Sequence, residues 1–144
     1  MASIAGQLAD AVTAALNAHD FGQAFTAART WMPDLERKDI ATLTVTVVPR
    51  LRENLAAATR AQNQSEYIID IGLQKSVKPS DNAAVDALVE LGEEIAAHFA
   101  RLALTDYPAA RILRVAQDPL ADPEHLRTQR QYTGIVSLTY LVVA

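Results

Sequence analysis

The sequence predicts an α+β fold, in which an antiparallel or mixed β-sheet of four to five strands carries two amphipathic helices packed on one face. Two segments repeat apolar residues at helical spacing, and three others place apolar residues at every second position. No shift in composition divides the chain of 144 residues into parts. A single domain over residues 1–144 is therefore expected.

The first predicted element is a helix close to the N-terminus. Ser3 is suited to cap it. Apolar residues recur along it at helical spacing, at Ile4, Leu8, Val12 and Leu16. The segment 24–32 follows, in which larger side chains alternate with small ones, and it is predicted to be extended as far as Pro33.

Two clear strand patterns come next, with a long connection between them. Over residues 42–49 the apolar side chains alternate with threonines, and Pro49 is expected to end the strand. Over residues 66–75 one face is apolar and carries Tyr67, Ile69, Ile71 and Leu73. The connection at about 50–65 exceeds an ordinary hairpin loop, and such loops are usually functional or disordered.

The second helix has the strongest pattern in the chain. Asp81 is placed to cap it, and one stripe comprises Val85, Leu88, Leu91, Ile95, Phe99 and Leu102. A strand at 111–117 follows, with Leu113 and Val115 on one face and Ile112 on the other. After a turn-rich segment, a long strand at 131–142 carries one apolar face, formed by Tyr132, Val136, Leu138, Tyr140 and Val142.

Composition excludes several classes of protein. The chain contains no cysteine, which excludes disulfide scaffolds, cysteine-based zinc ribbons and thiol nucleophiles. With 13 Lys and Arg against 17 Asp and Glu, its formal net charge of −4 argues against a dedicated nucleic-acid-binding protein. It has neither a signal-peptide pattern nor an apolar run long enough for a bilayer, so a soluble protein made in a cytoplasm is expected.

The residues that could carry chemistry are scattered. The three histidines, His19, His98 and His125, lie in different segments. Glu94 and His98 are four apart on the second helix and could face one metal ion, but two ligands do not make a site, and a helical ion pair or hydrogen bond explains them more simply. The acidic residues of the turn-rich segment lack the spacing of a calcium loop: Asp118, Asp122 and Glu124.

No motif for nucleophilic catalysis or phosphate binding is present. The chain has no nucleophile elbow, no P-loop and no dinucleotide-binding fingerprint. We therefore expect a protein that is not an enzyme, with no catalytic residue, no cofactor and no metal.

Two features suggest contact with other proteins. The long connection is rich in arginine, which is enriched at interfaces, and the polar face of the sheet includes two isoleucines. A solvated loop and isolated surface residues explain the same features equally well. The candidate interface residues are Arg50, Arg52, Arg60, Ile68 and Ile135.

The order of these segments resembles the small tail-terminator proteins of long-tailed bacteriophages, also called tail-completion or minor tail protein U-like proteins. The resemblance covers essentially the whole chain. It comprises the N-terminal helix, the strand Thr42-Leu-Thr-Val-Thr-Val-Val-Pro49, the arginine-bearing connection, the segments 66–75 and 85–91, and the closing strand from Tyr132. It rests on the order of elements and not on a sharp motif.

The resemblance implies a structural virion protein, located at the head-proximal end of the tail and assembled in the host cytoplasm. Such proteins form a ring, usually a hexamer, that ends polymerisation of the tail tube. The implied partners are other copies of the chain, the tail tube protein and a head-completion or neck protein, while DNA passes through the channel without specific binding. Two alternatives remain, a head–tail joining (connector) protein and a small α+β ligand-binding or enzymatic domain.

Overall fold

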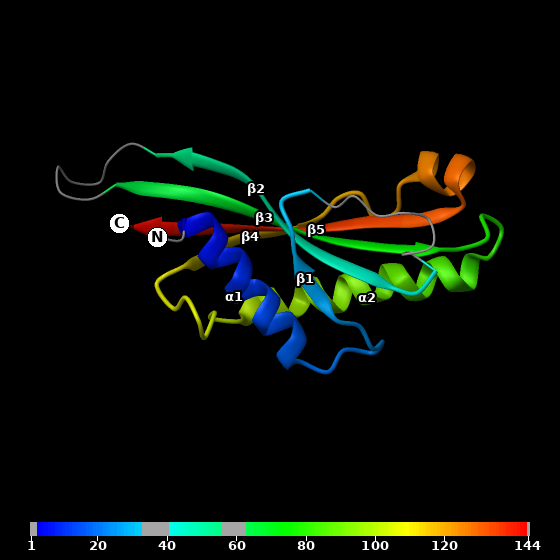
Figure 1. Cartoon of the computed structure of the whole chain (residues 1–144), viewed down its shortest axis with the longest axis horizontal. Helices are drawn as coiled ribbons and strands as arrows, with labels where there is room; N and C mark the ends of the chain where they lie inside the picture. The colour runs from blue at the N-terminus through cyan, green and yellow to red at the C-terminus, as the bar shows by residue number, and fades with distance from the viewer. Residues whose placement is uncertain (1–2, 33–40, 56–62, 144) are drawn as a thin grey trace.

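The protein is a two-layer α+β structure, as the sequence predicts. The computed structural model describes residues 3–32, 41–55 and 63–143. Its five strands form one sheet in the order β1-β2-β3-β5-β4, and both helices lie on one side of that sheet (Figure 1). The elements are α1 (Ile4–Ala18), β1 (Ala27–Arg29), β2 (Thr44–Asn54), β3 (Gln64–Ser76), α2 (Asn82–Arg101), β4 (Arg111–Gln117), η2 (His125–Gln129) and β5 (Gln131–Val143).

The sheet is mixed because β1 runs parallel to β2, whereas the other three pairs are antiparallel. The final strand, β5, lies inside the sheet between β3 and β4. It pairs with β3 along its whole length, from Gln64 opposite Val143 to Ser76 opposite Gln131. β3 and β5 therefore form the centre of the sheet, flanked by β2 and β4.

The core lies between the helices and one face of the sheet. α1 packs against β1, β2 and β3, and α2 packs against β4 and β5. The predicted apolar faces of β3 and β5 are buried here, as the alternation predicts. The largest fully buried side chains of this layer are Tyr132, Tyr140, Phe99, Leu8, Leu16, Ile69, Ile71 and Leu73.

Both helices begin at the predicted caps. The Ser3 hydroxyl accepts a hydrogen bond from the Gly6 amide at 3.0 Å, and the Asp81 carboxylate accepts one from the Ala84 amide at 3.1 Å. Each cap satisfies one of the amides that a first helical turn leaves without an intrahelical acceptor. The buried side of α2 is formed by Leu88, Leu91, Gly92, Ile95 and Phe99, which confirms most of the predicted stripe.

The connection predicted at 50–65 is shorter than expected, because strands occupy both of its ends. β2 continues past Pro49 to Asn54, and β3 begins at Gln64. Pro49 lies next to a shift in register between β2 and β3, and β1 does not extend along this part of β2. A proline, which has no amide hydrogen, is tolerated at such a bulge on an edge strand. Residues 56–62 lie outside the described part of the chain.

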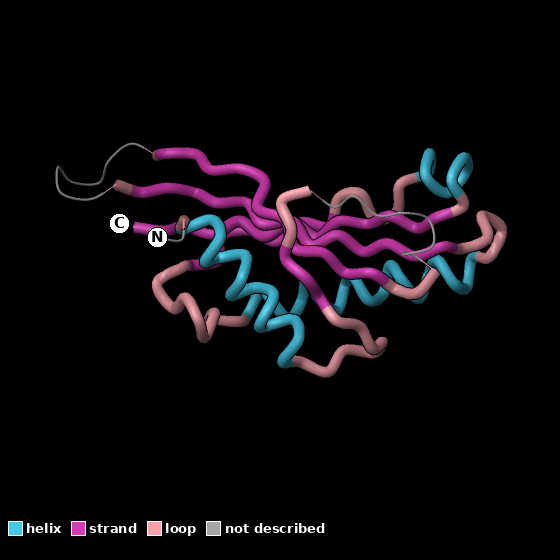
Figure 2. Tube along the Cα trace, in the orientation of Figure 1, coloured by secondary structure: helices cyan, strands magenta, loops and turns pink. Residues whose placement is uncertain are grey.

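This extension lengthens one end of the sheet, here called the arm, in which residues 51–54 of β2 pair with 65–68 of β3 and β3 pairs in turn with the end of β5. Figure 2 shows the arm reaching past the helices, near the two ends of the chain. Every residue of β2 from Arg50 to Asn54 is exposed. The β2 edge of the arm is therefore uncovered, whereas Ser65 and Tyr67 of β3 are buried.

Two further predictions need correction. The extended segment at 24–32 forms only the short strand β1. In β4 the register shifts between Ile112 and Arg114, so that Ile112 and Val115 both lie opposite core residues of β5. Leu113 is instead exposed. The strict alternation assumed from the sequence fails here because a bulge inserts one extra residue.

The predicted turn-rich segment contains η2, one short helical turn before β5. Among the described residues, no helix combines the length and the apolar character that crossing a membrane requires.

Candidate subunit interface

The candidate interface lies on the outer face of the sheet, the face opposite the helices (Figure 1). Pairing aligns its side chains in rows across four strands. One row contains Leu51, Ile68, Thr139 and Arg114 from β2, β3, β5 and β4 in turn. A neighbouring row contains Val48, Asp70, Ser137 and Ala116. The sequence predicts this face as the polar side of β3 and β5, but the rows mix apolar and charged groups.

A polar network crosses the middle of the outer face. Arg50 lies at the bulge of β2, and its Nε donates a hydrogen bond to Asp70 Oδ2 at 2.6 Å. The Ser137 hydroxyl donates to the other oxygen, Asp70 Oδ1, at 2.7 Å. The Asp70 side chain is only 14% exposed, whereas that of Arg50 is 52% exposed. The network therefore joins β2, β3 and β5 through one largely buried carboxylate and leaves the guanidinium partly accessible.

An apolar strip runs beside this network toward the arm. Leu51 lies directly opposite Ile68, and its side chain is 45% exposed. Leu113, at the bulge of β4, and Val143, at the end of β5, are also exposed, and Leu141 is half-buried. These apolar residues share one face of the sheet, with Glu66 and Thr139 among them, and apolar residues gathered on one face are typical of surfaces that contact other proteins.

Arginines of β4 border the strip on its other side. Arg114 is mostly exposed and makes a long ion pair of 3.4 Å with Glu66 of β3. Arg111 lies opposite Leu141 and is exposed. With Arg50 on the β2 side, the apolar strip has guanidinium groups on both flanks. Apolar centres rimmed by charged residues are the usual anatomy of an interface.

A shallow hollow of about 180 Å³ indents the outer face away from the arm. It forms where Gly72 of β3 lies between Thr46 and Ile135 and contributes no side chain. The walls are Thr46, Val48, Asp70, Gly72, Gln74, Thr133 and Ile135. The hollow is a place where a side chain of a neighbouring molecule would fit.

The structure brings three of the predicted interface residues to the outer face. Arg50, Ile68 and Ile135 all lie there. The two isoleucines are well separated, because Ile135 lies opposite Gly72, which is four residues, about 13 Å, from Ile68 along β3. The Asp70 network lies between them. Arg52 lies opposite Tyr67 and extends over the ring of Tyr67, at 6.0 Å from its centre, on the other face. Arg60 lies outside the described residues.

Sequence reasoning missed a cluster of aromatic rings at the ends of the two helices. The rings of His19 and His98 stack with their centres 4.0 Å apart, and Phe21 meets both edge-on. Burial lowers the pKa of His98 below its ordinary value, and the neighbouring His19 lowers it further. Glu94, placed beside His98 by the sequence, accepts a hydrogen bond from the Gly22 amide at 3.0 Å. Residues distant in sequence meet here, so no local pattern indicates it.

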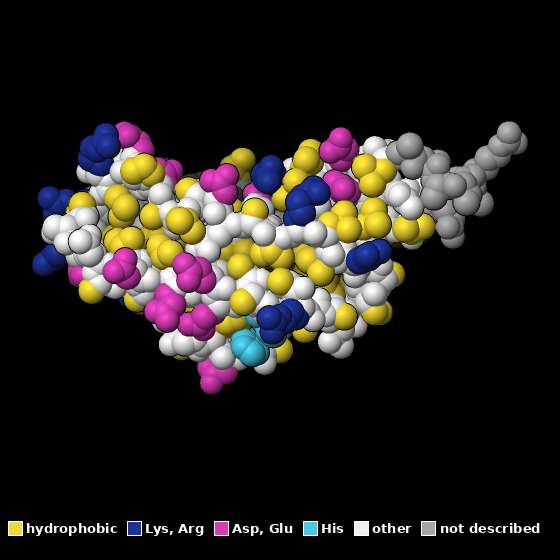
Figure 3. All heavy atoms as spheres, turned by 180° about the vertical axis from the view of Figure 1, so that it is seen from behind, with side chains coloured by type: hydrophobic (Ala, Val, Ile, Leu, Met, Phe, Trp, Pro, Cys, Tyr) yellow, Lys and Arg dark blue, Asp and Glu magenta, His cyan; other side chains and the backbone are white. Residues whose placement is uncertain are grey.

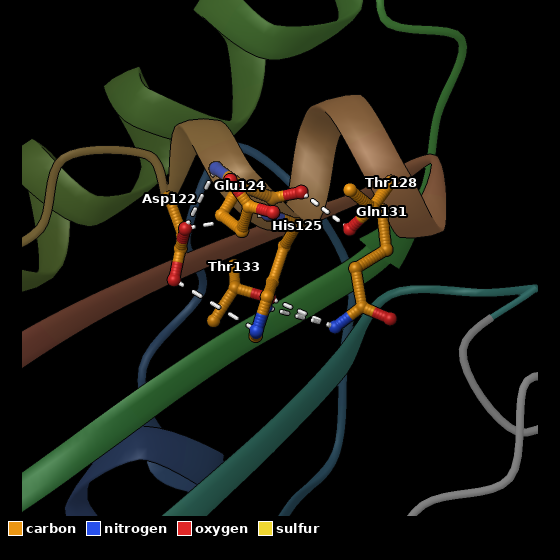
Figure 4. A network of polar contacts seen from close by, with 6 residues as sticks. All are labelled: Asp122, Glu124, His125, Thr128, Gln131 and Thr133. Atoms are coloured by element: carbon orange, nitrogen blue, oxygen red, sulfur yellow. Dashed lines mark hydrogen bonds and ion pairs between the residues drawn. The ribbon is translucent and has the colours of Figure 1, made fainter.

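A second cluster holds η2 against the outer face (Figure 4). The Nδ1 of His125 lies 2.8 Å from the Thr133 hydroxyl, which also accepts a hydrogen bond from Gln131 Nε2 at 2.9 Å. The Asp122 carboxylate accepts hydrogen bonds from the amides of Glu124 and His125, and its other oxygen lies 3.8 Å from His125 Nε2. Asp122, for which calcium binding is the other interpretation, thus acts as a cap for this turn.

The described residues contain no group of three or more His, Asp or Glu side chains arranged to hold a metal ion. Comparison of the chain with protein-family models and with curated protein sequences finds no match. The candidate interface therefore rests on the geometry of the outer face alone.

Proposed function

We propose that this protein is a structural component of a bacteriophage virion, a tail terminator whose copies form a ring at the head-proximal end of the tail tube. The observation that carries the proposal is the outer face of the sheet, on which an apolar strip lies between arginines of β2 and β4. The fold supports the proposal because α1 and α2 leave this face uncovered, with only the short turn η2 against one part of it.

A ring requires that two different surfaces of one molecule fit each other, so that each copy contacts the next head to tail. The outer face and the exposed side of the helical layer lie on opposite sides of this protein (Figure 1). Both surfaces are thus available to two neighbours at once. In the proposed ring the projecting arm extends from one subunit toward the next.

Tube assembly in the presence of the protein tests the function. We expect negative-stain images of tubes, polymerised from the tube protein of the same phage, to show shorter tubes with a ring at one end when this protein is added. Bovine serum albumin at equal concentration serves as the control. A protein that stays monomeric beside the tubes and leaves their length unchanged contradicts the proposal.

Tube assembly together with a binding assay on isolated portal rings separates the terminator from a head–tail joining protein of the same virion. A joining protein binds the portal side of the assembly and leaves tube length unchanged. Binding to isolated portal rings without any effect on tubes would therefore assign the chain to the joining position instead.

A further inference from the structure

The exposed side of α2 is acidic and therefore complementary to the arginines of the outer face. Acidic residues at helical spacing, Asp86, Glu90 and Glu93, all point away from the core and are exposed. The other exposed positions of α2 are mostly small, at Ala83, Ala87, Ala97 and Ala100, and they also include Glu94 and, in the last turn, Arg101. Figure 3 shows acidic side chains gathered along the part of the surface to which α2 contributes. The exposed face of α2 is therefore acidic over residues 86–94, with a single arginine in its last turn.

The exposed charges of the outer face near the arm are mainly positive. Arg50, Arg111 and Arg114 are exposed there, whereas Asp70 and Glu66 are largely covered and already paired with two of these arginines. Glu53, at the end of the arm, is the exposed acid of this region within the described residues. A guanidinium has five donors, so each paired arginine retains hydrogen atoms for a second carboxylate.

We infer that α2 of a second copy of this chain docks on the outer face, with its alanines over the apolar strip and its carboxylates against the flanking arginines. The inference rests on the proposed self-assembly and names the two surfaces that meet. Small residues let a helix approach a sheet closely, and opposite charges on the two surfaces fix the register of the contact. Like charges disfavour the other pairings, helix face against helix face or sheet face against sheet face.

The contact is heterologous, because the two surfaces lie on opposite sides of the molecule. Each copy offers α2 to one neighbour and its outer face to the other. Such contacts build a ring when successive copies are related by a rotation that closes, and a filament otherwise. The exposed apolar residues of the strip, Leu51 and Leu113 among them, are buried in this arrangement.

Site-specific crosslinking tests the inference directly, because the natural chain has no cysteine. A protein with both Ala87→Cys and Leu51→Cys places one thiol on each proposed surface. Mild oxidation at the highest soluble concentration is expected to give a ladder of covalent oligomers, since a disulfide accumulates even from a weak contact. The matched control carries Ala14→Cys, on the exposed side of α1, together with Leu51→Cys, and is expected to stay largely monomeric.

Charge reversal provides a second test of the same contact, with the crosslinking yield as the measurement. The change Arg111→Glu with Arg114→Glu is expected to lower crosslinking several-fold, and adding Glu90→Arg and Glu93→Arg to the same chain is expected to restore it. Crosslinking of the Ala87→Cys protein that is no greater than that of the Ala14→Cys control overturns the inference. If images show rings but this crosslink does not form, the proposed function stands and the inference is rejected. If crosslinked chains form but never cap tubes, the inference stands and the proposed function is rejected.

Discussion

Two buried tyrosines of β5 differ in one respect, the partner of the hydroxyl. The Tyr132 hydroxyl donates a hydrogen bond to the Leu120 carbonyl at 2.6 Å, whereas Tyr140 is buried and its hydroxyl has no partner among the described residues. Burial raises the pKa of Tyr132 to about 12 and raises that of Tyr140 further, since the charged form is poorly solvated in the core. The hydrogen-bonded hydroxyl of Tyr132 therefore stabilises the fold, whereas the buried hydroxyl of Tyr140 destabilises it.

We predict that Tyr140→Phe raises the free energy of unfolding by about 1 kcal/mol, because it removes a buried hydroxyl that lacks a hydrogen bond within the described part of the chain. Tyr132→Phe is the matched control and should lower the free energy of unfolding by about 1 kcal/mol, because it deletes a hydrogen bond. Urea denaturation measures both. Equal losses in the two variants would contradict the assignment.

The stacked histidines predict a dependence of stability on pH. His98 has a lowered pKa in the folded protein, so the unfolded chain binds a proton more readily than the folded one. Its contribution to stability is present above about pH 6.5 and is lost as the pH falls below that value. His98 lines a separate surface hollow at the ends of the two helices, and the other titratable groups that line it are His19, Glu94 and Arg101.

Replacement of His98 by Phe keeps a stacked ring and removes the titration. We predict that the urea midpoint falls less between pH 7.5 and pH 5 in His98→Phe than in the natural protein. Far-UV circular dichroism at pH 7.5 verifies that the variant is folded. An acid dependence as steep as that of the natural protein would show that other groups are responsible.

At the scale of elements, the two glycines of the central strands differ in what surrounds them. A Cβ at Gly134 would meet the Tyr132 hydroxyl and lie 3.0 Å from the Leu120 carbonyl oxygen, on the packed face. A Cβ at Gly72 would lie 3.0 Å from the Thr46 hydroxyl, on the outer face where the hollow provides room. The same substitution therefore probes the packed and the open face of one sheet.

We predict that Gly134→Ala lowers the free energy of unfolding by about 1–3 kcal/mol, since the buried Tyr132 ring must move. Gly72→Ala should change it by less than about 1 kcal/mol. Thermal unfolding of the two variants measures the difference. A larger loss for Gly72→Ala would mean that the outer face is as tightly packed as the core.

The hydrogen bonds around Asp70 predict that replacing Asp70 destabilises the protein more than replacing Arg50 does. Asp70→Ala deprives Arg50 and Ser137 of their shared acceptor at a largely buried position, and we expect a loss of about 1–3 kcal/mol. Arg50→Ala removes a half-exposed partner and should cost less than about 1 kcal/mol. Chemical denaturation compares them, and the reverse order would contradict the proposed geometry.

The helices and the central strands could be predicted from sequence because their signals are local. Ser3 and Asp81 cap the helices, and β3 and β5 alternate over most of their 13 residues, so a wrong register would expose the whole apolar face. The bulges could not be predicted. Arg50 and Leu113 each occupy the extra position in a strand, and only pairing with β3 and β5 reveals the shift.

The candidate site could be predicted only in part, because it also depends on pairing between strands that are distant in the sequence. Arg50 was identified by its residue type, but its acceptor Asp70 lies 20 residues away and becomes a neighbour only through the pairing of β2 with β3. The stacking of His19 on His98 depends on how α1 and α2 pack and has no counterpart in the sequence pattern. The order of strands, with β5 inside the sheet, likewise follows from long-range contacts.

At the scale of the whole molecule, the protein has one covered and one open sheet face. The helices bury the inner face, and the outer face presents the apolar strip, its arginines and the hollow at Gly72. The helices complete the hydrophobic core, but the apolar strip on the outer face stays exposed to solvent. Assembly with further copies would bury the strip, which accounts for exposed apolar residues on an otherwise polar strand face.

The most direct test of this account is analytical ultracentrifugation of the protein with preformed tail tubes, comparing the natural chain with Leu51→Asp and Leu120→Asp. Both leucines are about half exposed, but Leu51 lies on the strip and Leu120 in the segment after β4. We predict that the natural protein and Leu120→Asp co-sediment with the tubes as rings, whereas Leu51→Asp stays in the supernatant as a monomer. Co-sedimentation of Leu51→Asp equal to that of the natural protein would contradict assembly through the outer face.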